Sequence, residues 1–117
     1  MGKKLKWPKK VKVWKSMYGT PVFFFHELEK LHQAMDYLQE GSSRHYPEQG
    51  MGVVIPYERD GRSKLILMGV FNKEPATLAH ECVHAAYFVL DHAGIKHDVD
   101  NHEVLAYMVS DMMERFK

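Results

Sequence analysis

The segment from residue 75 to residue 92 constrains this chain most, because its apolar residues recur at the spacing of an α-helix. Pro75 stands in the first turn, where a helix tolerates proline, and Gly94 follows as a stop signal. The spacing therefore predicts a helix over residues 75–92 with one side packed on a core. The apolar side is formed by Leu78, Ala79, Cys82, Val83, Ala86, Val89 and Leu90.

This predicted helix contains the pattern H-E-x-x-H, which starts at His80. Because an α-helix has about 3.6 residues per turn, His80 and His84 lie one above the other on the same face. Two imidazoles in that position can bind one metal ion, and Glu81, about 100° round the helix, can reach a water on that ion. The pattern therefore predicts a metal centre, and the alternative is a pair of surface histidines on an acidic helix. We expect Cys82 to point into the core as a small buried hydrophobe.

A catalytic zinc site usually takes three protein ligands and leaves a fourth position to water. Glu103, which opens the next predicted helix, is the first choice for the third ligand, since two histidines and one glutamate form an established zinc set. The pattern Asp100 to Glu103 also fits a capping box, which would explain the glutamate without a metal. His102 is the next candidate, followed by His97, Asp98, Asp100 or no third protein ligand.

The chemistry expected of such a centre is hydrolysis. Zinc lowers the pKa of a bound water towards ~7 and polarises a carbonyl, while Glu81 takes the proton of the water as general base. Tyr107, one turn beyond Glu103, is predicted to stabilise the oxyanion, with Tyr87 and His92 as alternatives. A substrate strand is expected along residues 64–71, the predicted strand just before the motif.

The rest of the sequence predicts an α+β fold. One helix is expected over residues 26–40 and a second C-terminal helix over residues 102–116. Asp60-Gly61 predicts the turn of a β-hairpin, and Pro56 indicates that the first hairpin strand is interrupted or lies at an edge. Strands are predicted over residues 11–15, 22–25 (otherwise the lead into the helix), 51–57 and 64–71.

Composition and length limit the remaining possibilities. A chain of 117 residues suits one domain, here residues 11–117, preceded by a loose basic arm over residues 1–10. No apolar run is long enough to span a bilayer, and no apolar stretch follows the first lysines, so neither a transmembrane helix nor a signal peptide is predicted. The single cysteine excludes an internal disulfide and favours the reducing cytoplasm.

The charge is distributed unevenly along the chain. Residues 1–15 contain seven lysines and no acid, whereas the rest contains nine basic and fifteen acidic residues, a net charge of −6 with neutral histidines. A basic arm on an acidic body is suited to contact with nucleic acid or with an acidic partner. The favoured interpretation is nevertheless a solvated tail and an edge strand guarded by lysines.

His80, Glu81, His84 and Glu103 together resemble the zincin metallopeptidases in their gluzincin arrangement, over residues 64–116. The resemblance implies a minimal zincin-like fold and a zinc endopeptidase that acts on protein or peptide substrates. It also implies that the two histidines and Glu103 bind zinc and that Glu81 is the general base.

The sequence from Leu78 to Ala86 is also similar to small phage-borne and bacterial zincin-like proteins, and to SprT-like proteases, which act on DNA-associated proteins. Tyr87 and Leu90 stand where metzincins have glycine and histidine, which excludes that branch. The alternative is a zincin-fold interaction protein that binds a host or DNA-associated protein without cleaving it. The intact Glu81 favours the enzyme.

Overall fold

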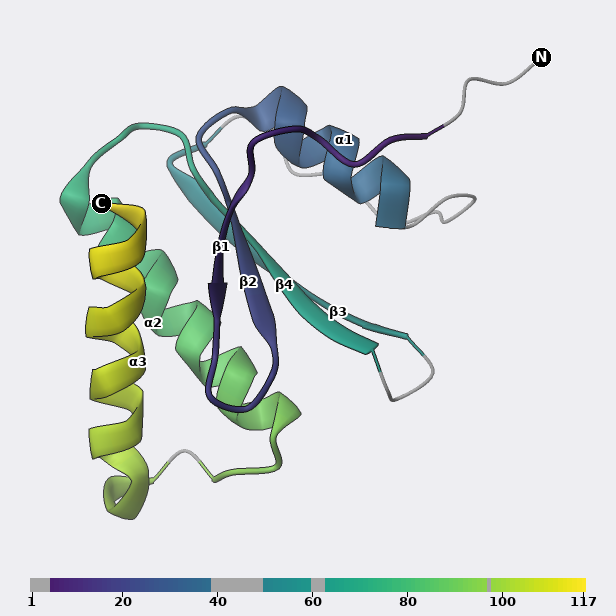
Figure 1. Cartoon of the computed structure of the whole chain (residues 1–117). Coiled ribbons are helices and arrows are strands. Elements are labelled where there is room, and N and C mark those ends of the chain that lie inside the picture. The colour runs from purple at the N-terminus through teal and green to yellow at the C-terminus, as the bar shows by residue number, and fades with distance from the viewer. Residues whose placement is uncertain (1–4, 39–49, 60–62, 97) are drawn as a thin grey trace.

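The computed structural model describes residues 5–38, 50–59, 63–96 and 98–117, and within them the chain is α+β. Four strands form one mostly antiparallel sheet, and three α-helices and one short 3-10 helix accompany it (Figure 1). The elements are β1 (Lys12–Lys15), β2 (Pro21–Phe25), α1 (Leu28–Leu38), β3 (Gly52–Arg59), β4 (Ser63–Val70), α2 (Pro75–His92), η1 (Val99–Asn101) and α3 (His102–Phe116).

The strands lie in the order β1-β2-β4-β3. The β1–β2 and β3–β4 pairs are antiparallel hairpins, whereas β2 and β4 run parallel, with Val22 opposite Ile66 and Phe25 opposite Gly69. The chain therefore crosses from β2 through α1 before the second hairpin returns beside β2. The outer strands, at the two edges of the sheet, are β1 and β3.

Both faces of the sheet are covered, and each has its own core. Ile66 and Met68 of β4 belong to the larger cluster with α2 and α3, whereas Leu67 belongs to a second cluster with Leu31 and Met35 of α1. Figure 1 shows this arrangement, with α2 and α3 on one side of the sheet and α1 on the other. Because successive side chains alternate between faces, the apolar run of β4 is that of a strand buried on both sides.

The central position of β4 corrects one prediction. Residues 64–71 were expected to offer a free edge to a substrate strand, but β4 is hydrogen-bonded on both sides, to β2 and to β3. The edge next to the second hairpin belongs to β3 instead. The prediction that Pro56 marks an edge strand is confirmed, because Pro56 lies within β3.

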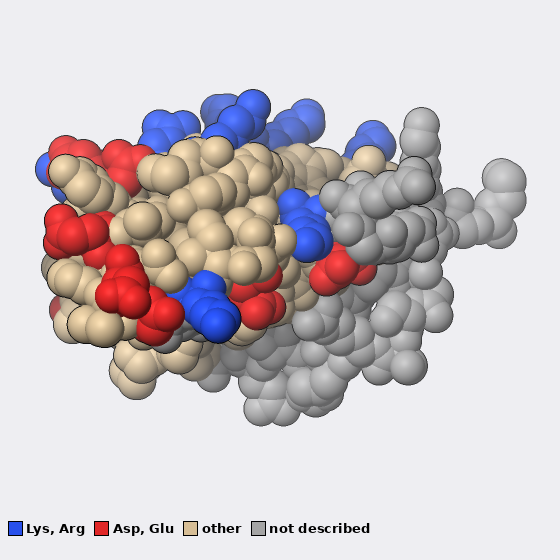
Figure 2. All heavy atoms as spheres, turned by 90° about the horizontal axis from the view of Figure 1, so that it is seen from below, with Lys and Arg blue, Asp and Glu red and all other residues tan. Residues whose placement is uncertain are grey.

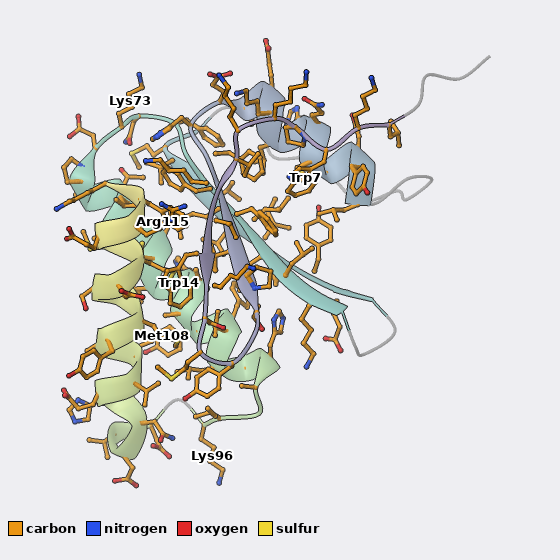
Figure 3. All side chains as sticks on the ribbon, viewed as in Figure 1. Trp7, Trp14, Lys73, Lys96, Met108 and Arg115 are labelled. Carbon is orange, nitrogen blue, oxygen red and sulfur yellow. The ribbon has the colours of Figure 1, made fainter. Side chains whose placement is uncertain are left out.

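The N-terminal segment is packed where the structure describes it. Trp7 makes edge-on ring contacts with Phe23, Phe25 and Tyr37, and Gln33 of α1 donates a hydrogen bond to the carbonyl of Lys6 at 3.1 Å. Residues 5–8 therefore lie against the body of the domain, in contrast to the loose arm expected over residues 1–10. Figure 3 shows Trp7 beneath α1.

Several predictions fall on residues outside the described ranges. These are the first four residues of the arm, the last two residues of the helix predicted over 26–40, the Asp60-Gly61 turn and His97. In the described part of the chain, none of the helices combines the length and the apolar character that crossing a membrane requires.

Candidate metal centre

Helix α2 carries the motif, and both of its ends are set by local chemistry. Pro75 is in the first turn, and Asn72 accepts a hydrogen bond from the Glu74 amide at 3.0 Å while its side chain donates to the Thr77 hydroxyl at 2.8 Å. At the other end, Gly94 has φ of +74°, the left-handed conformation in which glycine ends helices. The predicted helix over residues 75–92 is confirmed at both bounds.

His80 and His84 point to solvent from the same face of α2. Their Nε2 atoms lie 3.1 Å apart, and the ring planes are inclined at 71°. Two nitrogen ligands at ~2.05 Å from one zinc ion in tetrahedral geometry lie ~3.3 Å apart. The spacing of the pair therefore matches the bite of a single zinc ion, and it also suits a hydrogen bond between two neutral imidazoles.

Glu81 completes a compact group with the two histidines. One ligand atom from each of the three residues lies within 4.8 Å of the others. Unlike the exposed histidines, the Glu81 side chain is only 7% exposed. It lies against β3, because a Cβ atom built on Gly52 would come within 2.8 Å of its Oε2. Glu81 thus stands between the histidine pair and the edge strand.

Cys82 lies on the core side of the same helix, as predicted. Its side chain is fully buried, and burial, followed by the negative charge of Glu81, raises the pKa of the thiol to about 12. A thiol with that pKa stays protonated near neutral pH, so Cys82 has neither the charge of a metal ligand nor that of a nucleophile.

Glu103 is exposed in the first turn of α3 and is not part of the group formed by His80, Glu81 and His84. Helices α2 and α3 run in opposite directions, so the start of α3 is remote from the start of α2 (Figure 1). The structure therefore does not bring Glu103 to the histidine pair. His102 occupies the same turn and is also exposed.

The predicted capping box at the start of α3 is wrong. Its N-cap is Asn101, without a side-chain capping bond, and Asp98 instead accepts a hydrogen bond from the Asp100 amide at 3.0 Å. The reason is the 3-10 helix η1, which precedes α3 and has Asp98 as its own N-cap. Glu103 therefore does not serve as a cap.

Tyr107 lies on α3 and is 68% exposed. It lines a hollow of about 570 Å³ together with Trp14, Lys15 and Asp111, beside β1. Because β1 and β3 are opposite edges of the sheet, this hollow is on the other side of the domain from Glu81. Tyr87, by contrast, follows His84 by three residues on α2 and is 38% exposed.

Sequence reasoning missed two residues at the centre. Gly52 is in contact with Glu81. The sequence carries a hint of this contact, because a glycine inside a strand often marks a place where another group lies close to the backbone. Val83 was predicted on the apolar side of the helix but is 38% exposed next to His84, and Ala85 is buried in its place. An exposed valine and an exposed tyrosine thus border the histidine pair.

The backbone of β3 nearest Glu81 faces outward. The Met51 carbonyl accepts a hydrogen bond from the Phe71 amide at 2.9 Å, so Met51 and Phe71 form a hydrogen-bonded pair of the ladder. The next pair along the strands is Gly52 and Val70. In an antiparallel ladder such pairs alternate, so the N–H and C=O groups of Gly52 and Val54 point away from β4. Pro56 follows the same alternation, and its missing N–H costs no ladder bond.

No model of a protein family matches the sequence, and comparisons with curated proteins and with solved structures likewise find no match.

Proposed function

We propose that this protein is a zinc-dependent peptide hydrolase, in which His80 and His84 bind the metal and Glu81 is the general base. The observation that carries the proposal is the group of three ligand atoms within 4.8 Å, with the two Nε2 atoms 3.1 Å apart. The two imidazole nitrogens fit zinc, which readily accepts such donors, and the carboxylate of Glu81 lies close enough to act on a water bound to the ion. The buried Cys82 suits a reducing compartment, and we propose the cytoplasm as the place of action.

Zinc bound by the two imidazoles would polarise a carbonyl and lower the pKa of a water. Glu81 would accept the proton of that water and return it to the leaving amine. The low exposure of its carboxylate supports this role, since a partly desolvated base holds a defined position next to the histidines. Tyr87 is better placed than Tyr107 to donate a hydrogen bond to the oxyanion, because it shares the helix of the histidines.

An extended peptide would bind along β3. The outward N–H and C=O groups of Gly52 and Val54 can pair with its main chain, a mode of recognition that needs little side-chain specificity. This pairing would bring the peptide to Glu81, which lies against Gly52. Such an arrangement supports a protein or peptide substrate rather than a small metabolite.

The test compares His84→Ala, Glu81→Gln and His26→Ala. We expect wild-type protein to bind about one zinc per chain and His84→Ala to lose it, since a single imidazole holds the ion poorly. Glu81→Gln should keep zinc and lose cleavage of a peptide library by ~10³-fold, within the usual range for a general base. His26, exposed before α1, provides the matched histidine control, and its variant should behave as wild type.

Elemental analysis and fluorogenic peptides read out the two effects. Zinc undiminished in His84→Ala would overturn the metal site, and full activity in Glu81→Gln would overturn the base. Glu103→Gln and His102→Ala serve as further controls in the same assay, because both residues lie in the first turn of α3, outside the group formed by His80, Glu81 and His84, and both variants should retain wild-type zinc content.

A second candidate function is binding without cleavage, and the basic N-terminal segment favours it. Basic side chains line one border of the surface in Figure 2. The exposed lysines in the described part of this segment make no ion pair with a described acid, so they are available to phosphates. They are Lys6, Lys9, Lys10, Lys12 and Lys15.

The partner would be nucleic acid, or a protein bound to it. Replacing Lys9, Lys12 and Lys15 by Gln should weaken binding to a labelled DNA duplex and reduce the salt dependence of its affinity by roughly one unit of slope per lost phosphate contact. The control is Lys96→Gln, at an exposed lysine in the connection after α2. An unchanged salt slope in the triple variant would contradict this role.

A further inference from the structure

Gly52 is the residue of β3 that lies closest to the proposed base. A Cβ atom at this position would stand 2.8 Å from Oε2 of Glu81 and 2.9 Å from its Cγ. Real Cβ atoms essentially never approach other heavy atoms this closely. The Glu81 side chain therefore occupies the space that any other residue at position 52 would fill.

The backbone at this position does not require glycine. Among the glycines of the described residues, positive φ angles occur at Gly19 and Gly94, not at Gly52. Gly52 pairs with Val70 in the regular register of the β3–β4 hairpin. A glycine weakens a strand, because it loses more conformational freedom on folding than any other residue. What the glycine provides here is room rather than conformational freedom.

We propose that Gly52 is a positioning residue for Glu81. By leaving the α2-facing side of β3 without a side chain, it lets the carboxylate lie over the strand and within 4.8 Å of the ligand atoms of His80 and His84. A side chain at position 52 would displace the carboxylate from this place. The catalytic meaning of the contact rests on the proposed hydrolase function, whereas the contact itself does not.

The first experiment is a double-mutant cycle on stability, which needs no activity. In a Glu81→Ala background the new Cβ keeps a tight contact with the Gly69 carbonyl at 3.0 Å, but alanine normally stabilises a strand relative to glycine, so Gly52→Ala should there change the melting temperature little. In the wild-type background, the overlap with Glu81 should lower it by ~5 °C. A larger loss in the wild-type background than in the Glu81→Ala background supports the proposal, and equal shifts in the two backgrounds overturn it.

The second experiment separates positioning from a general structural defect. Gly52→Ala should retain zinc and KM but lower kcat by ~10- to 100-fold, the cost of misplacing a catalytic group by about 1 Å. In a Glu81→Gln background the same substitution should lower the residual kcat no further. A change confined to KM, or an equal fold-loss of kcat in both backgrounds, would overturn the proposal.

The two experiments distinguish this proposal from the function on which it rests. If wild-type protein shows no metal-dependent cleavage, the hydrolase function fails, and the melting cycle still decides whether Gly52 positions Glu81. If wild type cleaves and Glu81→Gln does not, but Gly52→Ala is fully active, the function stands and the positioning role fails.

Discussion

The two edges of the sheet, β1 and β3, are treated in opposite ways. Along β1, Arg115 of α3 donates a hydrogen bond to the Val13 carbonyl at 2.9 Å, and the Trp14 indole donates to Asp111 at 2.7 Å (Figure 3). Along β3, the outward backbone of Gly52 and Val54 faces away from the sheet next to Glu81. The β1 edge is covered by side chains of α3, whereas the β3 edge has outward backbone groups next to the proposed general base.

This difference has a physical cause. An exposed strand edge is a template for pairing with another chain, so proteins normally block it with charges, proline or a covering element. β1 has lysines at both ends and is covered by α3, whereas β3 has Pro56 in its middle, and among the described residues no loop or turn hydrogen bond involves the backbone of Gly52 or Val54. An edge left open at the motif is expected when an extended peptide has to bind there.

The largest expected effect comes from blocking the open edge. Val54→Pro removes one outward N–H of β3 without removing a ladder bond, as Pro56 already does. We expect kcat/KM for peptide cleavage to fall about tenfold, the cost of roughly one main-chain hydrogen bond. Val13→Pro is the matched control, because it removes an outward N–H from β1. Equal losses in both variants would remove the functional difference between the edges.

A smaller effect is expected from opening the closed edge. Asp111→Ala leaves the indole N–H of Trp14, a residue that is only 6% exposed, without its acceptor. We expect the free energy of unfolding to fall by ~1–2 kcal/mol, with zinc content and cleavage unchanged. Glu114→Ala is the control in denaturant titrations, because its ion pair with Lys117 is on the surface and contributes little. A loss of zinc in Asp111→Ala would contradict the separation of the two edges.

The smallest effect concerns His92, where α2 meets the second hairpin. Lys64 of β4 donates to the His92 carbonyl at 2.7 Å, and the buried Nδ1 of His92 has no hydrogen-bond partner among the described residues. Burial, followed by repulsion from Lys64, lowers the pKa of His92 from its ordinary value of 6.5. The unfolded chain therefore binds a proton at a higher pH than the folded chain does.

The sign of the pH dependence follows from this difference. The contribution of His92 to stability is present above pH ~6.5 and is lost as the pH falls through its lower folded pKa. Melting temperatures between pH 8 and pH 5 should decrease less for His92→Gln than for wild type. His102→Gln, at an exposed histidine, should retain the wild-type profile. Identical profiles for wild type and His92→Gln would show that His92 does not titrate in this range.

The helices of the fold could be predicted because their pattern is local. The bounds 75–92 and 102–116 follow from apolar spacing, Pro75 and Gly94, and the structure confirms them. The order of the strands could not be read in the same way, because β2 and β4 pair across α1. Residues 64–71 were placed at an edge because they directly precede the motif, whereas an apolar run such as Leu65 to Met68 is typical of a strand buried on both faces.

In the candidate site too, the residues that share one helix could be predicted, whereas those brought together by packing could not. His80, Glu81 and His84 belong to one helix, so their convergence follows from helical geometry alone. Glu103 and Tyr107 belong to another helix, and their position relative to the motif depends on how α3 packs, which a helical pattern does not encode. Gly52 comes from a strand some thirty residues earlier, and only the folded chain places it on Glu81.

Because Cys82 is buried, the rate at which its thiol reacts with a reagent reports on how often the core opens. The thiol is enclosed, and its pKa of about 12 keeps it protonated, so an alkylating reagent reaches a reactive thiolate only when α2 separates from the sheet. The labelling rate of this one cysteine therefore measures how often the helix that carries the motif detaches. A ligand that binds the closed form slows labelling in proportion to its occupancy, so binding can be followed by mass spectrometry without a known substrate.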